Sequence, residues 1–178
     1  MRIPGPLLPL RGKLIVSCQA EEGDALFGRM DLYAKAAVVG GAAGIRANGP
    51  IDVRSIRDAI AAPVIGILKR IQPDGKVLIT PSFEDARALV DAGAAAIAID
   101  CTRRGQATGA LDRLRRIKAE LCVPALADVA TVKEGLQAVE AGADFVLSTM
   151  RGYTDDTSEN RQFDPGFTSN SFVPFLCR

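Results

Sequence analysis

Short runs of apolar residues alternate along the chain with longer segments rich in alanine, leucine and charged residues. The runs predict six β-strands, in LIVSCQ, AGIRAN, VIGILK, AAIAID, PALADV and DFVLSTM. The segments between them predict helices in LYAKAAVVGG, residues 51–61, FEDARALVDAG, ALDRLRRIKAEL and TVKEGLQAVEAG. Continuous apolar strands separated by helices are typical of a parallel sheet, because parallel neighbours need a crossover connection. We therefore expect an α/β fold.

The ends of the predicted helices carry capping signals. A proline and Ser82 precede one helix, and Thr131 can cap another, with Glu134 three residues further on. Gly93 and Gly142 follow the helices of the related phrases LVDAGAAAIAID and AVEAGADFVLST, where left-handed caps belong. The similarity of these phrases indicates one supersecondary unit that is used repeatedly.

Two architectures are built from such units, the open doubly wound sheet and the closed (β/α)8 barrel. An open nucleotide-binding sheet is expected to carry GxGxxG or GxxxxGK[ST] after an early strand, and the chain has neither. In the barrel, polar groups from the carboxyl ends of many strands converge on one mouth. Polar residues follow nearly every predicted strand here, which favours the barrel: Ser17, Gln19, Arg46, Asn48, Lys69, Arg70, Asp100, Thr102, Asp128, Ser148 and Thr149.

Length and charge narrow the class further. A chain of 178 residues with 48% hydrophobic content predicts one domain with one substantial core. Its 22 basic and 21 acidic residues are dispersed along the chain, which argues against nucleic acid and membrane surfaces as partners. No apolar stretch is long enough to span a membrane, and three prolines interrupt the first 13 residues, so we expect a cytoplasmic protein.

The chain contains no histidine, which removes Ser-His-Asp and Cys-His nucleophiles and all histidine metal sites. Its four cysteines form no CxxC pair, and we interpret them as buried free thiols rather than ligands of a metal. Acid-base chemistry must then come from lysine, aspartate, glutamate, tyrosine or cysteine.

Lys69 is the most informative of the strand-end residues. A lysine in that position usually extends to water, but a barrel mouth that gathers several charges is expected to desolvate its ammonium beside a guanidinium. Both effects favour the neutral amine, which can accept a proton. Asp100 precedes a polar turn, so a helix-capping role and a functional role remain equally open for it.

At these residues the sequence resembles a known family. The phrases GKLIVSCQA, GIRANG, PVIGILKR, ITPSFEDARALVDAGA, IAIDCTRR, LADVAT and STMRGYT together resemble the N-acetylmannosamine-6-phosphate 2-epimerase family. The resemblance implies a (β/α)8 barrel of the ribulose-phosphate-binding type. It also implies cofactor-independent interconversion of N-acetyl-D-mannosamine 6-phosphate and N-acetyl-D-glucosamine 6-phosphate, a step of sialic acid and aminosugar catabolism. The implied partner is thus a phosphorylated N-acetylhexosamine. Whether the protein forms a homodimer is left undecided by the sequence.

The resemblance also assigns roles to individual residues. Lys69 in GILKR matches the catalytic lysine, which moves the proton at C2 of the sugar. Gln19, Arg46 and Asp128 match groups that bind the sugar, and Arg46 is suited to stabilising an enediolate-like oxygen. Three further strand-end residues are weaker candidates for the same site: Ser17, Asp100 and Thr149.

The chain departs from the family after Thr154. Members of the family continue with a seventh strand that ends in a glutamate and an eighth strand that ends in small residues. This chain contains no segment that matches either strand. We therefore expect about six of the eight β/α units in a single partial domain, with residues 163–178 as a divergent tail. The loss of the glutamate and of the phosphate site usual in the last two loops predicts very low activity.

Two other functions remain open. A different phosphosugar isomerase or lyase on the same fold would use Lys69 as a Schiff-base nucleophile, and borohydride would trap its adduct. Alternatively the chain is an inert fragment, or a part that another chain completes. Gel filtration combined with a thermal melt separates a folded assembly from an unstable monomer.

Overall fold

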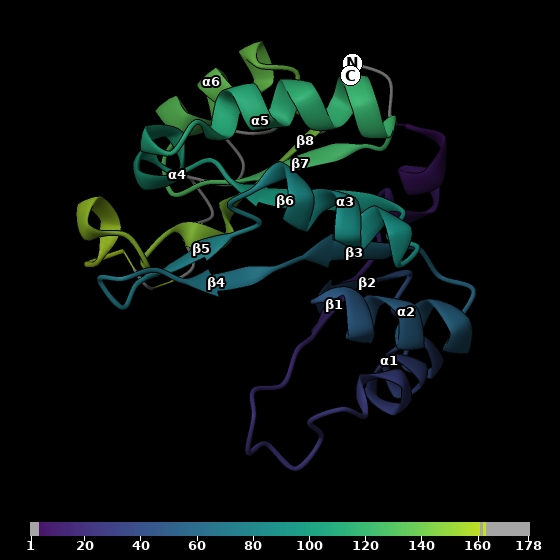
Figure 1. Ribbon diagram of the computed structural model, residues 1–178. Coiled ribbons are helices and arrows are strands. Elements are labelled where there is room, and N and C mark those ends of the chain that lie inside the picture. The colour runs from purple at the N-terminus through teal and green to yellow at the C-terminus, as the bar shows by residue number, and fades with distance from the viewer. Residues whose placement is uncertain (1–3, 161, 163–178) are drawn as a thin grey trace.

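The computed structural model describes residues 4–160 and 162, and its centre is a six-stranded parallel sheet (Figure 1). The strands occur in the sheet in chain order, so β1 and β8 form its two edges within this part of the chain. They are β1 (Ile15–Cys18), β2 (Gly44–Asn48), β3 (Val64–Ile67), β6 (Ala96–Asp100), β7 (Ala125–Asp128) and β8 (Phe145–Leu147). The prediction of six parallel strands connected by helices is confirmed.

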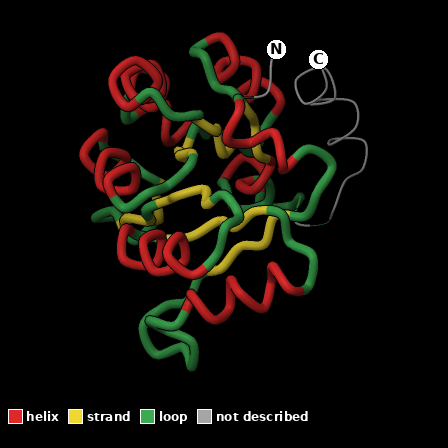
Figure 2. Tube along the Cα trace, turned by 90° about the vertical axis from the view of Figure 1, so that its right-hand side faces the viewer, coloured by secondary structure: helices red, strands yellow, loops and turns green. Residues whose placement is uncertain are grey.

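Five longer helices match the predicted segments and surround the strands (Figure 2). They are α1 (Met30–Val39), α2 (Pro50–Ala59), α3 (Phe83–Asp91), α5 (Ala110–Arg116) and α6 (Val132–Glu140). A π-helical turn, η2 (Ile117–Leu121), continues α5. The shorter helical elements were not predicted: η1 (Gly5–Leu10), α4 (Arg103–Ala107), η3 (Ser148–Met150) and η4 (Asp155–Thr157).

The predicted capping residues explain where two of these helices begin and end. The Ser82 hydroxyl accepts a hydrogen bond from the third residue of α3, and Thr131 forms a capping box with Glu134 at α6. Gly93 and Gly142 follow the two helices with φ angles of 97° and 100°, which glycine adopts without steric cost. The amide of each glycine and that of the next residue close a Schellman motif.

The sheet has two differently packed faces. Residues at alternating positions, such as Ile45, Ile97 and Ala127, pack in the large core shared with the helices. The other set lies inside the curl of the sheet and forms a second, smaller core: Leu7, Ile65, Ile67, Ile79, Ala96, Ala98 and Leu126. Side chains two positions apart on a strand point to the same face of the sheet. A strand-end residue two positions beyond a member of this second core therefore lies on the inner face.

A two-stranded antiparallel hairpin, β4 (Lys69–Ile71) and β5 (Val77–Ile79), follows β3 and was not predicted. The sequence interpretation continued the third strand to Lys69 and treated VLITPS as part of a connector. In the structure β3 ends at Ile67, and Lys69 is the first residue of the hairpin, paired with Ile79. Three-residue strands are too short to show a period of two, which explains why the pattern was missed.

The cysteines of the described residues follow the expectation only in part, and Cys177 lies outside these residues. Cys18 and Cys101 are buried free thiols as expected, and burial raises the pKa of Cys101 to about 12. Cys122 is exposed, and this part of the expectation was wrong, because the residue occupies a left-handed position (φ 54°) after η2.

The described residues also bear on ligands and on membrane insertion. Within residues 4–160 and 162, no cluster of acidic residues and cysteines suits a metal ion, and no helix is long and apolar enough to cross a membrane. The predicted divergent tail, 163–178, lies outside the described residues.

Candidate active site

The carboxyl end of the sheet gathers charged residues on the inner face. Lys69, Asp100 and Asp128 each stand two residues beyond an inner-core position on their segments. Arg46 is the register partner of inner-facing Ile65, and Ser17 is in turn the register partner of Arg46. Parallel strands place register partners on the same side of a sheet. Strand register therefore brings residues from β1 to β7 to one mouth.

Arg46 and Asp128 form an ion pair across this mouth. Nη2 of Arg46 lies 2.6 Å from Oδ2 of Asp128, although β3 and β6 separate their strands in the sheet. Asp128 is fully buried, and the hydroxyl of Thr149 donates to its other oxygen. Burial raises the pKa of Asp128, while Arg46 and Thr149 act in the opposite direction. Three of the candidate residues are thus in direct contact.

Asp100 is a second buried carboxyl on the same face. Its Oδ1 accepts hydrogen bonds from the amide (3.0 Å) and the hydroxyl (2.6 Å) of Thr102, and burial raises its pKa. Thr102, rather than Asp100, is the capping residue of α4. A Cβ on Gly105 would lie 2.1 Å from the Asp100 carbonyl oxygen, so only glycine permits this approach of α4 to β6.

Lys69 departs from the expectation that its ammonium is desolvated, because the residue is exposed. The hairpin carries it to the rim of the sheet, beyond the buried end of β3. Its backbone amide donates to Oδ1 of Asn48 (2.9 Å), whereas its Nζ has no hydrogen-bond or ion-pair partner among residues 4–160. Lys69 is therefore positioned by its backbone and not by its side chain.

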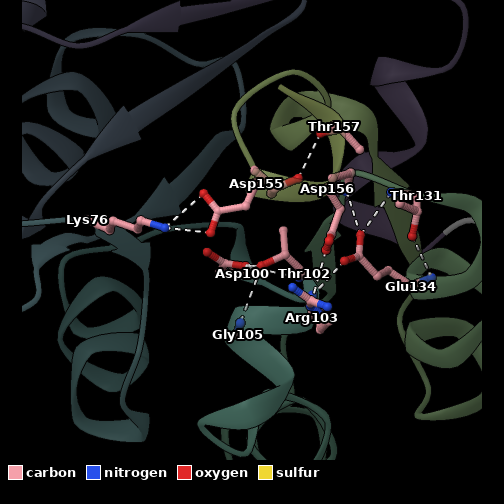
Figure 3. A network of polar contacts seen from close by, with 12 residues as sticks. Lys76, Asp100, Thr102, Arg103, Gly105, Thr131, Glu134, Asp155, Asp156 and Thr157 are labelled. Atoms are coloured by element: carbon pink, nitrogen blue, oxygen red, sulfur yellow. Dashed lines mark hydrogen bonds and ion pairs between the residues drawn. The ribbon is translucent and has the colours of Figure 1, made fainter. Parts of the chain in front are cut away.

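Lys69 and Asp100 line one cavity of about 440 Å³. Apolar side chains at its wall include Ile79 from the hairpin and Met150 from η3. Glu134 of α6 also lines it, but its two carboxylate oxygens accept from the amides of Arg103, Ala130 and Thr131 (Figure 3). Since these contacts fix Glu134 in place, its role in the site is structural. The sequence indicated only its part in the capping box.

Ion pairs connect three surface segments around the cavity. Lys76 of the hairpin contacts Asp155 of η4 (2.6 Å), and Arg103 of α4 contacts Asp156 (3.2 Å; Figure 3). A third pair joins Arg104 to Asp74 in the hairpin turn (2.7 Å). Five of these six residues line the cavity: Lys76, Asp155, Arg103, Asp156 and Arg104. No sequence pattern pointed to this arrangement, because the partners lie 30 to 79 positions apart along the chain.

Gln19 and Ser17 form a separate pair at the carboxyl end of the edge strand β1. Nε2 of Gln19 donates to the Ser17 hydroxyl (2.5 Å), and Oε1 of Gln19 is buried without a hydrogen-bond partner in the described part of the chain. Neither residue is among those that line the cavity. The seven predicted residues therefore fall into three groups: the Arg46, Asp128 and Thr149 contact, the Lys69 and Asp100 cavity, and the β1 pair.

Comparison with known proteins decides the family. The family model described as "Putative N-acetylmannosamine-6-phosphate epimerase" matches residues 30–169. A protein of Synechococcus elongatus named "Putative N-acetylmannosamine-6-phosphate 2-epimerase" is 40% identical over 163 residues, which are 89% of this chain and 69% of that protein. The chain belongs to this epimerase family. A protein of Thermosynechococcus vestitus with the same name is 42% identical over 151 residues, or 84% of this chain.

The epimerase family also provides a solved structure with the same fold. The N-acetylmannosamine-6-phosphate 2-epimerase from Clostridium perfringens superposes with a TM-score of 0.83 at 33% identity, covering 94% of this chain and 74% of that one. The fold is accordingly that of a (β/α)8 barrel, of which the described residues form six strands. The matched region makes up 66% of the Thermosynechococcus relative, so the chain spans about two thirds of its length.

Proposed function

We propose that this chain carries the active-site half of a cytoplasmic epimerase that interconverts N-acetyl-D-mannosamine 6-phosphate and N-acetyl-D-glucosamine 6-phosphate. The observation that carries the proposal is the shared cavity of Lys69 and Asp100 beside the Arg46–Asp128 pair. An amine and a buried carboxyl that face one space provide a proton acceptor and a proton donor. The family membership supports the choice of substrate.

Each residue has a role in this reaction. Lys69 removes the proton from C2 of the sugar and leaves an enediolate-like intermediate. We assign Arg46 to stabilising the negative charge that develops on the neighbouring oxygen, and its contact with Asp128 supports an oriented guanidinium. Burial raises the pKa of Asp100 and favours its protonated form, which suits a proton donor within the same cavity.

The experiment follows the C2 proton and not only the product. Epimerisation needs proton transfer on both faces of C2, whereas exchange of one epimer with solvent needs a single base. The purified chain is incubated at high concentration with N-acetylmannosamine 6-phosphate in deuterium oxide, and deuterium at C2 is measured by NMR. We expect incorporation, together with very low formation of N-acetylglucosamine 6-phosphate in a coupled assay.

Substitution of Lys69 tests the proposed base. Lys69→Met should lower the rate of C2 exchange by about 10²–10⁴-fold, the usual contribution of a positioned acid-base group. Lys35→Met, which removes an exposed lysine of α1, serves as the control and should leave exchange unchanged. Unaltered exchange in the Lys69 variant, or none in the parent chain, would contradict the proposal.

A Schiff-base mechanism for the same lysine makes a different prediction. Treatment with borohydride in the presence of substrate should give no covalent adduct if Lys69 acts as a base. A mass increase on Lys69 equal to the reduced sugar phosphate would instead support an isomerase or lyase that uses this residue as a nucleophile.

A further inference from the structure

Thr80 has an unusual backbone conformation next to the cavity. It directly follows β5, is fully buried and has a φ angle of 49°. Left-handed backbone is rare for a residue branched at Cβ, and Pro81 further restricts the residue before it to extended conformations. Glycine would adopt this conformation freely. A threonine in this position therefore indicates that its side chain does something a glycine could not.

The Thr80 side chain bridges two segments of the inner sheet. Its hydroxyl donates to the carbonyl of Ala98 on β6 (2.8 Å) and accepts from the amide of Leu68 (3.1 Å). The backbone amide of Thr80 also donates to the Leu68 carbonyl (2.7 Å). Both polar groups of Leu68, the residue between β3 and Lys69, are thus bonded to Thr80.

The backbone immediately before Lys69 is consequently held from two sides. Thr80 fixes Leu68 against β6, and Asn48 of β2 accepts the amide proton of Lys69 (2.9 Å). The Lys69 side chain itself has no such partner among residues 4–160. These backbone bonds fix the position of the Lys69 Cα and the direction of its Cα–Cβ bond. The side-chain torsions can change only the path of the side chain from that starting point.

We propose that Thr80 is a positioning residue for Lys69, and that its strained backbone is retained because its hydroxyl fixes the peptide before that lysine. Strain of this kind persists where the surrounding contacts over-determine it, and it is concentrated at functional sites. The catalytic meaning of the inference rests on the proposed function, whereas the positioning itself does not.

Three substitutions separate the hydroxyl from the backbone. Thr80→Val keeps the shape and removes the hydrogen bonds, Thr80→Ser keeps the hydroxyl, and Thr80→Gly relieves the strain without the hydroxyl. In the C2 exchange assay we expect the valine and glycine variants to lower kcat by about 10–100-fold with little change in KM, since small displacements of a catalytic group have large effects. The serine variant should keep most of the activity.

A remote core substitution controls for loss of stability. Val53→Ala removes buried methyl groups from α2, away from the cavity, and should lower stability without lowering kcat. Equal losses of kcat in Val53→Ala and Thr80→Val would overturn the inference. So would an unchanged kcat in Thr80→Val, or a serine variant as poor as the valine variant.

Amide hydrogen exchange tests the positioning without any turnover. In Thr80→Val the amides of Leu68 and Lys69 should exchange at least tenfold faster, whereas those of α6 should stay close to their rates in the parent chain. Unchanged protection of Lys69 would overturn the positioning even if the chain is active. If C2 exchange is absent in the parent chain but Lys69 loses protection in the variant, the proposed function fails and the positioning stands.

Discussion

Lys69 and Asp128 both lie at the carboxyl end of the sheet, beyond β3 and at the end of β7, yet the structure holds them in opposite ways. Asp128 is fully buried, and its two oxygens contact Arg46 and Thr149. Lys69 is exposed, and within residues 4–160 only its backbone is bonded, to Asn48 directly and to Thr80 through Leu68. The charge that we assign to the sugar-binding site is thus ordered through its side chain, whereas the proposed base is ordered through its backbone.

This difference suits the two proposed tasks. A group that stabilises developing charge is most effective when it is already oriented, because no reorganisation is then needed during the reaction. A base must first approach the C–H bond and then withdraw with its proton.

Removal of the Asp128 charge should have the largest effect on stability. Asp128→Asn leaves the largely buried guanidinium of Arg46, 14% exposed, without its counter-charge. We expect the free energy of unfolding to fall by about 3 kcal/mol, measured by urea denaturation.

A partly exposed pair provides the matched control. Glu120→Gln breaks the contact with Arg116, in which both side chains are about half exposed (45% and 51%), and should lower the free energy of unfolding far less. Similar losses of unfolding free energy in the two variants would show that burial adds nothing to the Arg46–Asp128 pair. The contrast between a buried, ordered Asp128 and an exposed Lys69 would then have no energetic basis.

Asp100 sharpens the comparison through pH. Burial raises its pKa in the folded state, so the folded protein binds this proton more tightly than the unfolded chain does. The resulting stabilisation is complete below the unfolded pKa, about 4, and is lost as the pH rises through the folded pKa. Asp100→Asn keeps the acceptor for Thr102 but cannot titrate, so its stability relative to the parent chain should improve with rising pH.

The urea unfolding midpoints of the variant and the parent chain, measured at several pH values between 4 and 8, test this trend. A difference between the variant and the parent chain that stays constant with pH would mean that the carboxyl of Asp100 is not perturbed. It would then lack the property for which we assign it as the proton donor.

The sequence predicted the parts of this site that lie directly at the ends of apolar strands. Asp100 and Asp128 fall at the carboxyl ends of β6 and β7 as expected, because long apolar strands fix the register and hence the face of each residue. The exposure of Lys69 was not predictable in this way. It depends on the hairpin, whose two strands are too short to show a pattern, and on a left-handed Thr80 that no propensity favours.

The smallest expected effect concerns the tip of the hairpin that carries Lys69. Lys76 contacts Asp155 of η4, and both side chains are largely exposed, so salt should screen the pair. Asp155→Asn should speed exchange of the Gln72 amide, which bonds to the Lys76 carbonyl near the hairpin turn, at low but not at high salt. The double change Lys76→Asp with Asp155→Lys should restore protection, while Asp112→Asn, which breaks an exposed pair within α5, should leave Gln72 unaffected.

The Lys69 amide should keep its exchange rate in all of these variants, because Asn48 and Thr80 hold it at the base of the hairpin and not at its tip. Loss of protection at Lys69 together with Gln72 would show that the hairpin moves as one body, and the ion pairs around the cavity would then share in positioning the base.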